Sequence, residues 1–170
     1  MEFLTAIKER IPDYAKDIRL NLDGVIARTS LAPEDAIGVA LAAAFAAKSK
    51  PLVDAFKAAA PAAEGNAALT AAAVMGMNNA WYPFVEMAGD EELKTQRAEL
   101  RMNAYATSGG VEKKKFEAYA LAASIVGKCH FCVASHYALL KKEGLTTQQL
   151  RDIGRIAAVV SAAAQVLAVS

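Results

Sequence analysis

Apolar residues recur at helical spacing along most of this 170-residue chain, and no segment shows the clean two-residue alternation of a strand. Alanine fills many of these apolar positions, and the chain contains only five prolines. Alanine has the highest helix propensity, and its small side chain lets neighbouring helices approach closely. The sequence therefore predicts an all-α fold, with residues 1–170 forming a single multihelical domain.

Proline, glycine and capping residues indicate where the helices begin and end. Pro12 is placed to open an early helix whose apolar stripe includes Tyr14. Thr146 and Gln149 form a capping box for a final helix that reaches about Val169. Between them the spacing predicts helices over residues 33–47, 51–60, 61–88, 91–106, 112–126 and 129–142.

Two stretches of the chain can be aligned at a constant offset. Residues 72–81 and residues 123–132 both begin with small residues and contain a glycine at the fifth position, Gly76 and Gly127. We treat an internal helical duplication as a hypothesis. If it holds, only the second copy carries reactive groups.

The charge pattern argues against several classes of partner. The net charge is +1, so we expect neither nucleic acid nor a membrane surface as an electrostatic partner. Residues 65–85 are uncharged and long enough to span a bilayer, but their alanines and asparagines favour a buried core helix. No leader pattern precedes the charged residues near the N-terminus, so we expect a cytoplasmic protein.

Every cysteine and histidine of the chain lies within eight residues: Cys129, His130, Cys132 and His136. Thiols and imidazoles are the side chains most readily tuned to ionise near neutral pH. On a helix, Cys129, Cys132 and His136 would share one face. A cysteine pair in a reducing compartment is more often redox-active or metal-binding than structural, so we expect the chemistry here.

The spacing of Cys132 and His136 is suited to activating a thiol. An ordinary thiol with a pKa of about 8.5 is only roughly 3% ionised at pH 7, so a thiol nucleophile needs help. His136, four residues after Cys132, can supply a base or a proton. Glu117, on the preceding predicted helix, is a candidate partner that keeps His136 protonated.

Other interpretations of the window remain open. The cysteines could be small buried hydrophobic residues, or Cys129, Cys132 and His136 could bind zinc with His130 or a carboxylate as fourth ligand. Zinc sites usually draw on two separated clusters, and the chain has no second one. Val133 stands where c-type haem attachment requires histidine, which excludes haem. A thioredoxin domain is disfavoured because its motif follows a strand.

These residues, together with others, resemble the alkylhydroperoxidase D family of the carboxymuconolactone decarboxylase-like superfamily. The distinguishing element is Glu117 upstream of a Cys-x-x-Cys-x-x-x-His motif. The resemblance covers most of the chain and includes residues 12–22, 75–79 and 100–103. The resemblance implies an all-helical homotrimer and a thiol peroxidase cycle. The expected substrates are alkyl hydroperoxides, with hydrogen peroxide or peroxynitrite as further candidates.

The resemblance also implies a role for each residue. Cys132 attacks the peroxide, Cys129 resolves the sulfenic acid to a disulfide, and Glu117 and His136 belong to the proton relay. The family usually has a histidine immediately before the second cysteine, where this chain has Phe131; His130 lies one position earlier. A shift of one residue turns a helical side chain by about 100°. We therefore expect His130 to contribute little to the proton relay, which is then shortened to Glu117 and His136 or completed by water.

The implied reductant is dihydrolipoamide carried on a 2-oxoacid dehydrogenase acyltransferase, with alkyl hydroperoxide reductase C as a further partner. We expect no bound cofactor and no metal. The alternatives are a general disulfide reductase that uses the same cysteines, and a non-enzymatic, zinc-binding helical assembly protein. A lactone decarboxylase is disfavoured, since that branch does not depend on the cysteine pair.

Overall fold

Every regular element of the protein is a helix. The computed structural model describes residues 1–170 and contains no strand, which confirms the predicted all-α class. Short 3-10 turns at Glu2–Leu4, Asp13–Ala15 and Ser108–Gly110 accompany the α-helices. The helices are α1 (Thr5–Glu9), α2 (Lys16–Ala27), α3 (Pro33–Ala46), α4 (Lys50–Ala59), α5 (Ala62–Ala88), α6 (Glu91–Thr95), α7 (Asn103–Ala106), α8 (Lys113–Gly127), α9 (His130–Lys142) and α10 (Thr147–Val169).

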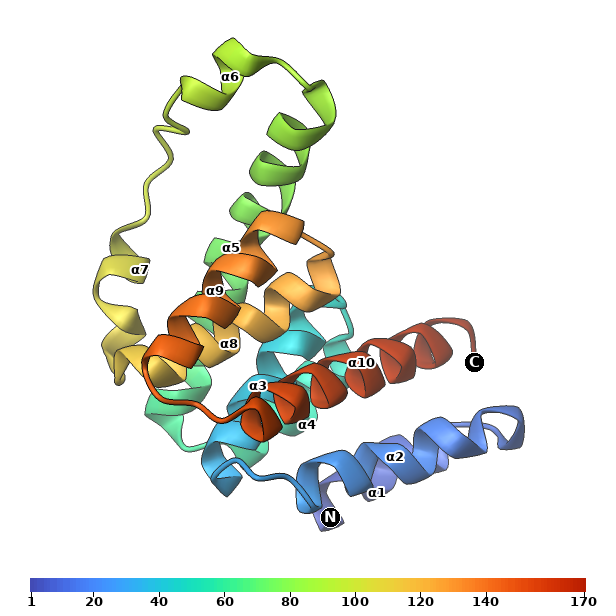
Figure 1. The fold of residues 1–170 in the computed structure, drawn as a ribbon. Helices are drawn as coiled ribbons and strands as arrows, with labels where there is room; N and C mark the ends of the chain where they lie inside the picture. Colours follow the sequence, from blue (N-terminus) through green and yellow to red (C-terminus); the bar gives the residue numbers. More distant parts are fainter.

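Helix α3 is central to the core, where it packs against α5, α8 and α10 (Figure 1). Its residues Val39–Ala44 are fully buried, and most of them are alanines that let the surrounding helices come close. Gly38 serves the same purpose, because a Cβ there would lie 2.4 Å from the ring of the buried Tyr119 on α8. Small residues on α3 therefore decide how closely α8, which carries Glu117, packs into the core.

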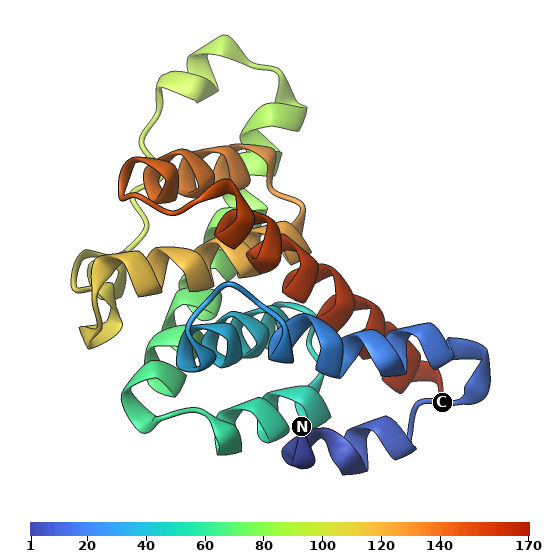
Figure 2. The ribbon, with the colours of Figure 1, turned by 60° about the horizontal axis from the view of Figure 1, so that its bottom comes forward.

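The N-terminal helices cover the other side of the bundle, where α2 lies along α10 and α4 lies against α3 (Figure 2). A buried carboxylate fastens α10 to the loop before α3: Asp152 Oδ2 accepts hydrogen bonds of 2.8 Å from both the backbone N–H and the hydroxyl of Ser30. Arg155 and Arg151 pair with the other oxygen. Although burial raises the pKa of Asp152, these bonds outweigh it and hold the pKa well below its usual range.

Most predicted helix boundaries are confirmed. Helix α3 begins at Pro33, and the capping box of Thr146 and Gln149 opens α10 as expected. Two expectations were wrong. Tyr14 lies in a 3-10 turn ahead of α2 and is 75% exposed, so it is not part of an apolar stripe. Residues 91–106 form two short helices, α6 and α7, joined by non-helical chain, because their apolar residues lack the regular spacing that buries one face.

Two long helices bear on the question of membrane spans. The first half of α5 is a core helix as expected, with Ala67, Ala71 and Met75 buried, but its second half extends beyond the bundle together with α6 (Figure 1). Only α10 is long and apolar enough to cross a membrane. It packs against α2, α3 and α8 and carries the buried Asp152, so α10 is a core helix of the bundle.

Candidate active site

The turn between α8 and α9 places the two cysteines. Helix α8 ends at Gly127, Lys128 adopts the left-handed conformation, and Cys129 is the N-cap of α9. The sulfur of Cys129 accepts a hydrogen bond of 3.2 Å from the backbone N–H of Cys132. The cysteine pair thus lies at a helix N-terminus, whose unpaired N–H groups stabilise negative charge on sulfur.

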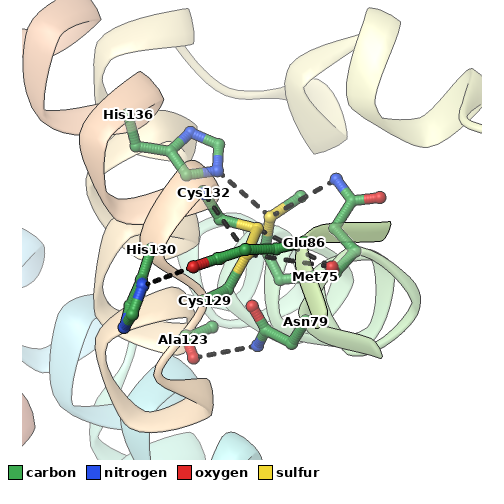
Figure 3. The surroundings of a disulfide bond; sticks show 9 residues. Met75, Asn79, Glu86, Ala123, Cys129, His130, Cys132 and His136 are labelled. Carbon is green, nitrogen blue, oxygen red and sulfur yellow. Dashed lines mark hydrogen bonds and ion pairs between the residues drawn. A yellow bond between two sulfur atoms is a disulfide. The ribbon is translucent and has the colours of Figure 1, made fainter. Parts of the chain in front are cut away.

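Helix α5 forms the floor beneath this turn. Asn79 donates a hydrogen bond of 3.1 Å from its amide to the carbonyl of Ala123, which ties α5 to the last turns of α8 (Figure 3). Gly127 permits this approach, because a Cβ there would lie 2.2 Å from the Asn79 amide nitrogen. The carbonyl of Asn78 lies 3.8 Å from the sulfur of Cys129 and 3.7 Å from that of Cys132.

Cys129 and Cys132 are joined in a disulfide, with their Cα atoms 5.2 Å apart. No free cysteine remains. Cys129 is fully buried, whereas Cys132 is 3% exposed and lines a cavity of about 180 Å³. Cys129 does not line this cavity. A small molecule that enters it would therefore meet the sulfur of Cys132 first.

Glu117 and His136 form a buried pair beside the disulfide. The Nδ1 atom of His136 lies 2.6 Å from Glu117 Oε2, and the hydroxyl of Tyr105 donates a hydrogen bond to the other carboxylate oxygen. Burial by itself raises the pKa of Glu117, but the bonds from His136 and Tyr105 outweigh it and hold the pKa below its ordinary value. Burial and the nearby carboxylate raise the pKa of Tyr105, so the phenol stays a donor. Glu117 is therefore an ionised acceptor.

The other ring nitrogen of His136 faces a thioether. Nε2 lies 3.1 Å from the sulfur of Met75 on α5 (Figure 3). Nδ1 faces the carboxylate of Glu117 and Nε2 faces the thioether, so both ring nitrogens of His136 lie within hydrogen-bonding distance of an acceptor at the edge of the cavity. In this disulfide form Nε2 bonds to Met75, and no hydrogen bond joins His136 to Cys132.

The structure brings four of the five predicted site residues together and leaves one outside. His136 and Cys132 line the same cavity, and Glu117 and Cys129 lie directly behind them. His130 does not line it: its side chain is 82% exposed on the outer face of α9, where Nδ1 lies 3.1 Å from Glu86 (Figure 3). Phe131 lines the cavity instead and stacks on Tyr82, with ring centroids 4.2 Å apart.

The sequence reasoning assigned no role in the site to three of its residues: Met75, Asn78 and Tyr105. Their contacts come from α5 and α7, which are remote from the cysteines in sequence. Met75 and Asn78 belong to the segment 75–79 that carried part of the family resemblance, a signal that pointed to them without a role. Nothing in the pattern around Tyr105 pointed to Glu117.

The zinc interpretation receives no support from the geometry. No group of three or more His, Cys, Asp or Glu side chains lies close enough together to hold a metal ion. With His130 turned outward and both sulfurs bonded to each other, the four residues of the window do not converge on one point. The fold and the site together define a helical dithiol–disulfide protein with a buried acid–imidazole pair.

Comparisons with known proteins agree with this class. The carboxymuconolactone decarboxylase family matches residues 91–170. An alkyl hydroperoxide reductase AhpD of Rhodospirillum centenum is 44% identical over 168 residues, which covers 96% of this chain and 90% of the relative. AhpD of Maricaulis maris is 43% identical, covering 97% of each, and AhpD of Coxiella burnetii is 39% identical, covering 96% of each. The chain belongs to the AhpD family.

Proposed function

We propose that this protein is an oxidoreductase that reduces alkyl hydroperoxides through a dithiol–disulfide cycle of Cys129 and Cys132. The observation that carries the proposal is the asymmetry of the pair: Cys132 shares a cavity with His136, whereas Cys129 is sealed beneath it. The relatives that match nearly the whole chain bear the name alkyl hydroperoxide reductase, which supports the same reaction.

The first step oxidises Cys132. Its thiolate attacks the terminal oxygen of the hydroperoxide, the O–O bond breaks, and sulfur becomes a sulfenic acid. His136, oriented by its bond to Glu117, gives a proton to the departing alkoxide, which leaves as the alcohol. The neutral imidazole then regains a proton from the Cys132 thiol when the next cycle begins.

The second step forms the disulfide. The Cys129 thiol attacks the sulfenic sulfur of Cys132 and water leaves, which is consistent with the 5.2 Å between the two Cα atoms. Because Cys129 is the N-cap of α9, it is well placed to be the leaving thiolate when the disulfide is reduced again. A reducing thiol would then attack Cys132, the sulfur exposed to the cavity.

The reductant in this proposal is a dihydrolipoyl group on a 2-oxoacid dehydrogenase acyltransferase. One of its thiols attacks Cys132, Cys129 leaves, and its second thiol closes the lipoyl disulfide, so two electrons pass to the protein. No cofactor is resident in the proposed cycle. Alkyl hydroperoxide reductase C is the proposed second partner, and the cytoplasm the proposed compartment.

A homotrimer completes the proposal. Large apolar side chains are exposed on the part of α5 that extends beyond the bundle, among them Phe84 and Met87. Exposed apolar groups of this kind are typical of surfaces that another chain covers. Light scattering on a size-exclusion column should give three times the mass of the 17.9 kDa chain.

The function is tested by steady-state turnover with cumene hydroperoxide, dihydrolipoamide and a lipoamide dehydrogenase that regenerates it. Wild type should consume peroxide, whereas Cys132→Ser and Cys129→Ser should both lose turnover. A general disulfide reductase would instead reduce a small disulfide such as oxidised glutathione faster than the peroxide. Peroxide consumption that survives in Cys132→Ser would refute the assignment of the nucleophile.

A further inference from the structure

A second, larger cavity lies beside the catalytic one. Its volume is about 480 Å³, against about 180 Å³ for the cavity at Cys132. Helix α5 and the segment around α6 form most of its wall, in the part of the molecule that extends beyond the bundle (Figure 1). Its hydrophobic lining consists of Trp81, Tyr82, Val85, Leu93 and Phe131.

Two aromatic rings divide the two cavities. Tyr82 and Phe131 line both of them, and the rings stack with an interplanar angle of 24°. Phe131 is the residue next to Cys132 and is 56% exposed. A molecule whose oxygen atoms reach the sulfur of Cys132 has this aromatic wall immediately beside it.

The catalytic cavity is too small for a bulky substrate. Its volume of about 180 Å³ lies below the roughly 300–1,000 Å³ that is typical of sites that enclose a drug-sized ligand. That is room for a hydroperoxy group and a short alkyl chain. A larger apolar group must extend either into solvent or past Tyr82 and Phe131 into the second cavity, whose size is in the range of small-molecule sites.

We infer that the second cavity binds the apolar part of a bulky organic hydroperoxide while its peroxide oxygens lie at Cys132. The inference rests on the proposed function and adds the substrate class: apolar hydroperoxides, aromatic ones included, are favoured over short-chain ones. Trp81 and Leu93 line this cavity and not the catalytic one. Phe84 and Met87 on the same helix do not line this cavity.

Binding can be measured without turnover, because Trp81 is the only tryptophan of the chain and lines the cavity. The probe is 2-phenyl-2-propanol, the unreactive alcohol that corresponds to cumene hydroperoxide. The emission of Trp81 should change saturably with this alcohol and not with tert-butanol, and Leu93→Ala should weaken binding of the probe several-fold. No saturable change, or a change that follows protein concentration alone because a second copy covers the cavity, would overturn the inference.

Kinetics supply the second arm. Trp81→Ala should lower kcat/KM for cumene hydroperoxide about tenfold and for tert-butyl hydroperoxide less than twofold, since lost apolar contacts affect only the bulky substrate. The matched control is Tyr14→Ala, which removes an exposed aromatic ring that lines neither cavity. A rise in the KM for dihydrolipoamide in Trp81→Ala, with cumene hydroperoxide unaffected, would place the reductant there and refute the inference.

The binding and kinetic experiments together distinguish a failure of this inference from a failure of the proposed peroxidase function. Saturable binding of the alcohol by a protein that reduces neither hydroperoxide would support the cavity's apolar preference and refute the peroxidase. Equal losses for both hydroperoxides in Trp81→Ala, with no binding of the alcohol, would refute the apolar site alone.

Discussion

Residues 72–81 and residues 123–132 align in sequence, yet they do different things in the fold. The first stretch runs through Gly76 without a break, inside the continuous helix α5. The second ends α8 at Gly127, turns at Lys128 and begins α9 at Cys129. The difference lies in what surrounds each glycine: nothing lies within 4 Å of a Cβ placed on Gly76, whereas the side chain of Asn79 fills that space at Gly127.

The comparison shows how one stretch supports the chemistry of the other. The first stretch contains no ionisable side chain, and its Met75, Asn78 and Asn79 contact the imidazole, the disulfide and the end of α8. The second stretch turns the chain sharply enough to place two sulfurs at a helix N-terminus. The turn at Lys128 is therefore what distinguishes the second stretch, with its reactive helix N-terminus, from the first stretch, which lies inside a continuous helix.

The largest expected effect comes from removing the negative charge of Glu117, which pairs with His136 next to the second stretch. Glu117→Gln keeps a hydrogen-bonding group but removes the negative charge 2.6 Å from Nδ1 of His136. Peroxide turnover should fall by about 10²–10⁴-fold, the usual contribution of a positioned acid or base. The control is Glu112→Gln, an exposed position just before α8. Full activity in Glu117→Gln would mean that the pair plays no part in proton transfer.

The next effect concerns the turn itself. In Gly127→Ala the new methyl group would lie 2.2 Å from the amide nitrogen and 2.9 Å from the Cβ of Asn79, which cannot rotate away. Overpacking of this kind costs about 1–3 kcal/mol of unfolding free energy, or a drop in Tm of about 2–12 °C in a protein of this size. Thermal unfolding followed by circular dichroism measures it. An unchanged Tm would show that α5 and α8 are not held together at this point.

Acid should lower the stability that the Glu117–His136 pair beside the second stretch contributes, whereas the first stretch has no side chain that titrates. The pKa of Glu117 is below its ordinary value, so its contribution to stability is present above the unfolded pKa, about 4.3, and is lost as the pH falls toward the lower folded pKa. Urea unfolding between pH 5 and pH 3 should therefore show falling stability, with a shallower decline in Glu117→Gln. Asp152, whose pKa is also lowered, should keep contributing to the decline in that variant.

The smallest effect is a gain. Gly76→Ala adds a methyl group to the interior of α5 with nothing within 4 Å, so it should raise stability by about 0.5–1 kcal/mol through helix propensity. The same substitution thus has opposite signs at the two aligned glycines. A loss of stability in Gly76→Ala, measured by the same thermal unfolding, would contradict the structural difference between the two stretches.

Local patterns predicted the elements that local chemistry determines. Pro33 and the capping box of Thr146 and Gln149 define helix starts within a few residues, and the structure confirms both. The prediction for Tyr14 failed because a 3-10 turn precedes α2, which begins only at Lys16. The prediction for residues 91–106 failed because apolar residues without regular spacing do not indicate which face is buried.

The candidate site likewise contains residues that the sequence could predict and residues that it could not. Cys129, Cys132 and His136 are close in sequence, and the pairing of Glu117 with His136 follows from adjacent helices. The contacts of Met75 and Tyr105 depend on how α5 and α7 pack against α8 and α9, which no sequence periodicity encodes. Phe131 was expected only as a departure from the family; its stacking on Tyr82 required the three-dimensional arrangement.

The most direct test of the account is a single anaerobic turnover of the reduced Cys129→Ser protein with one equivalent of cumene hydroperoxide, in the presence of the sulfenic-acid probe dimedone. With no resolving thiol, the sulfenic acid should persist, and mass spectrometry should find the adduct on Cys132. The matching experiment on Cys132→Ser should give no adduct. An adduct on Cys129 in Cys132→Ser, or unmodified Cys132 in Cys129→Ser, would contradict the assignment of Cys132 as the sulfur that meets the peroxide.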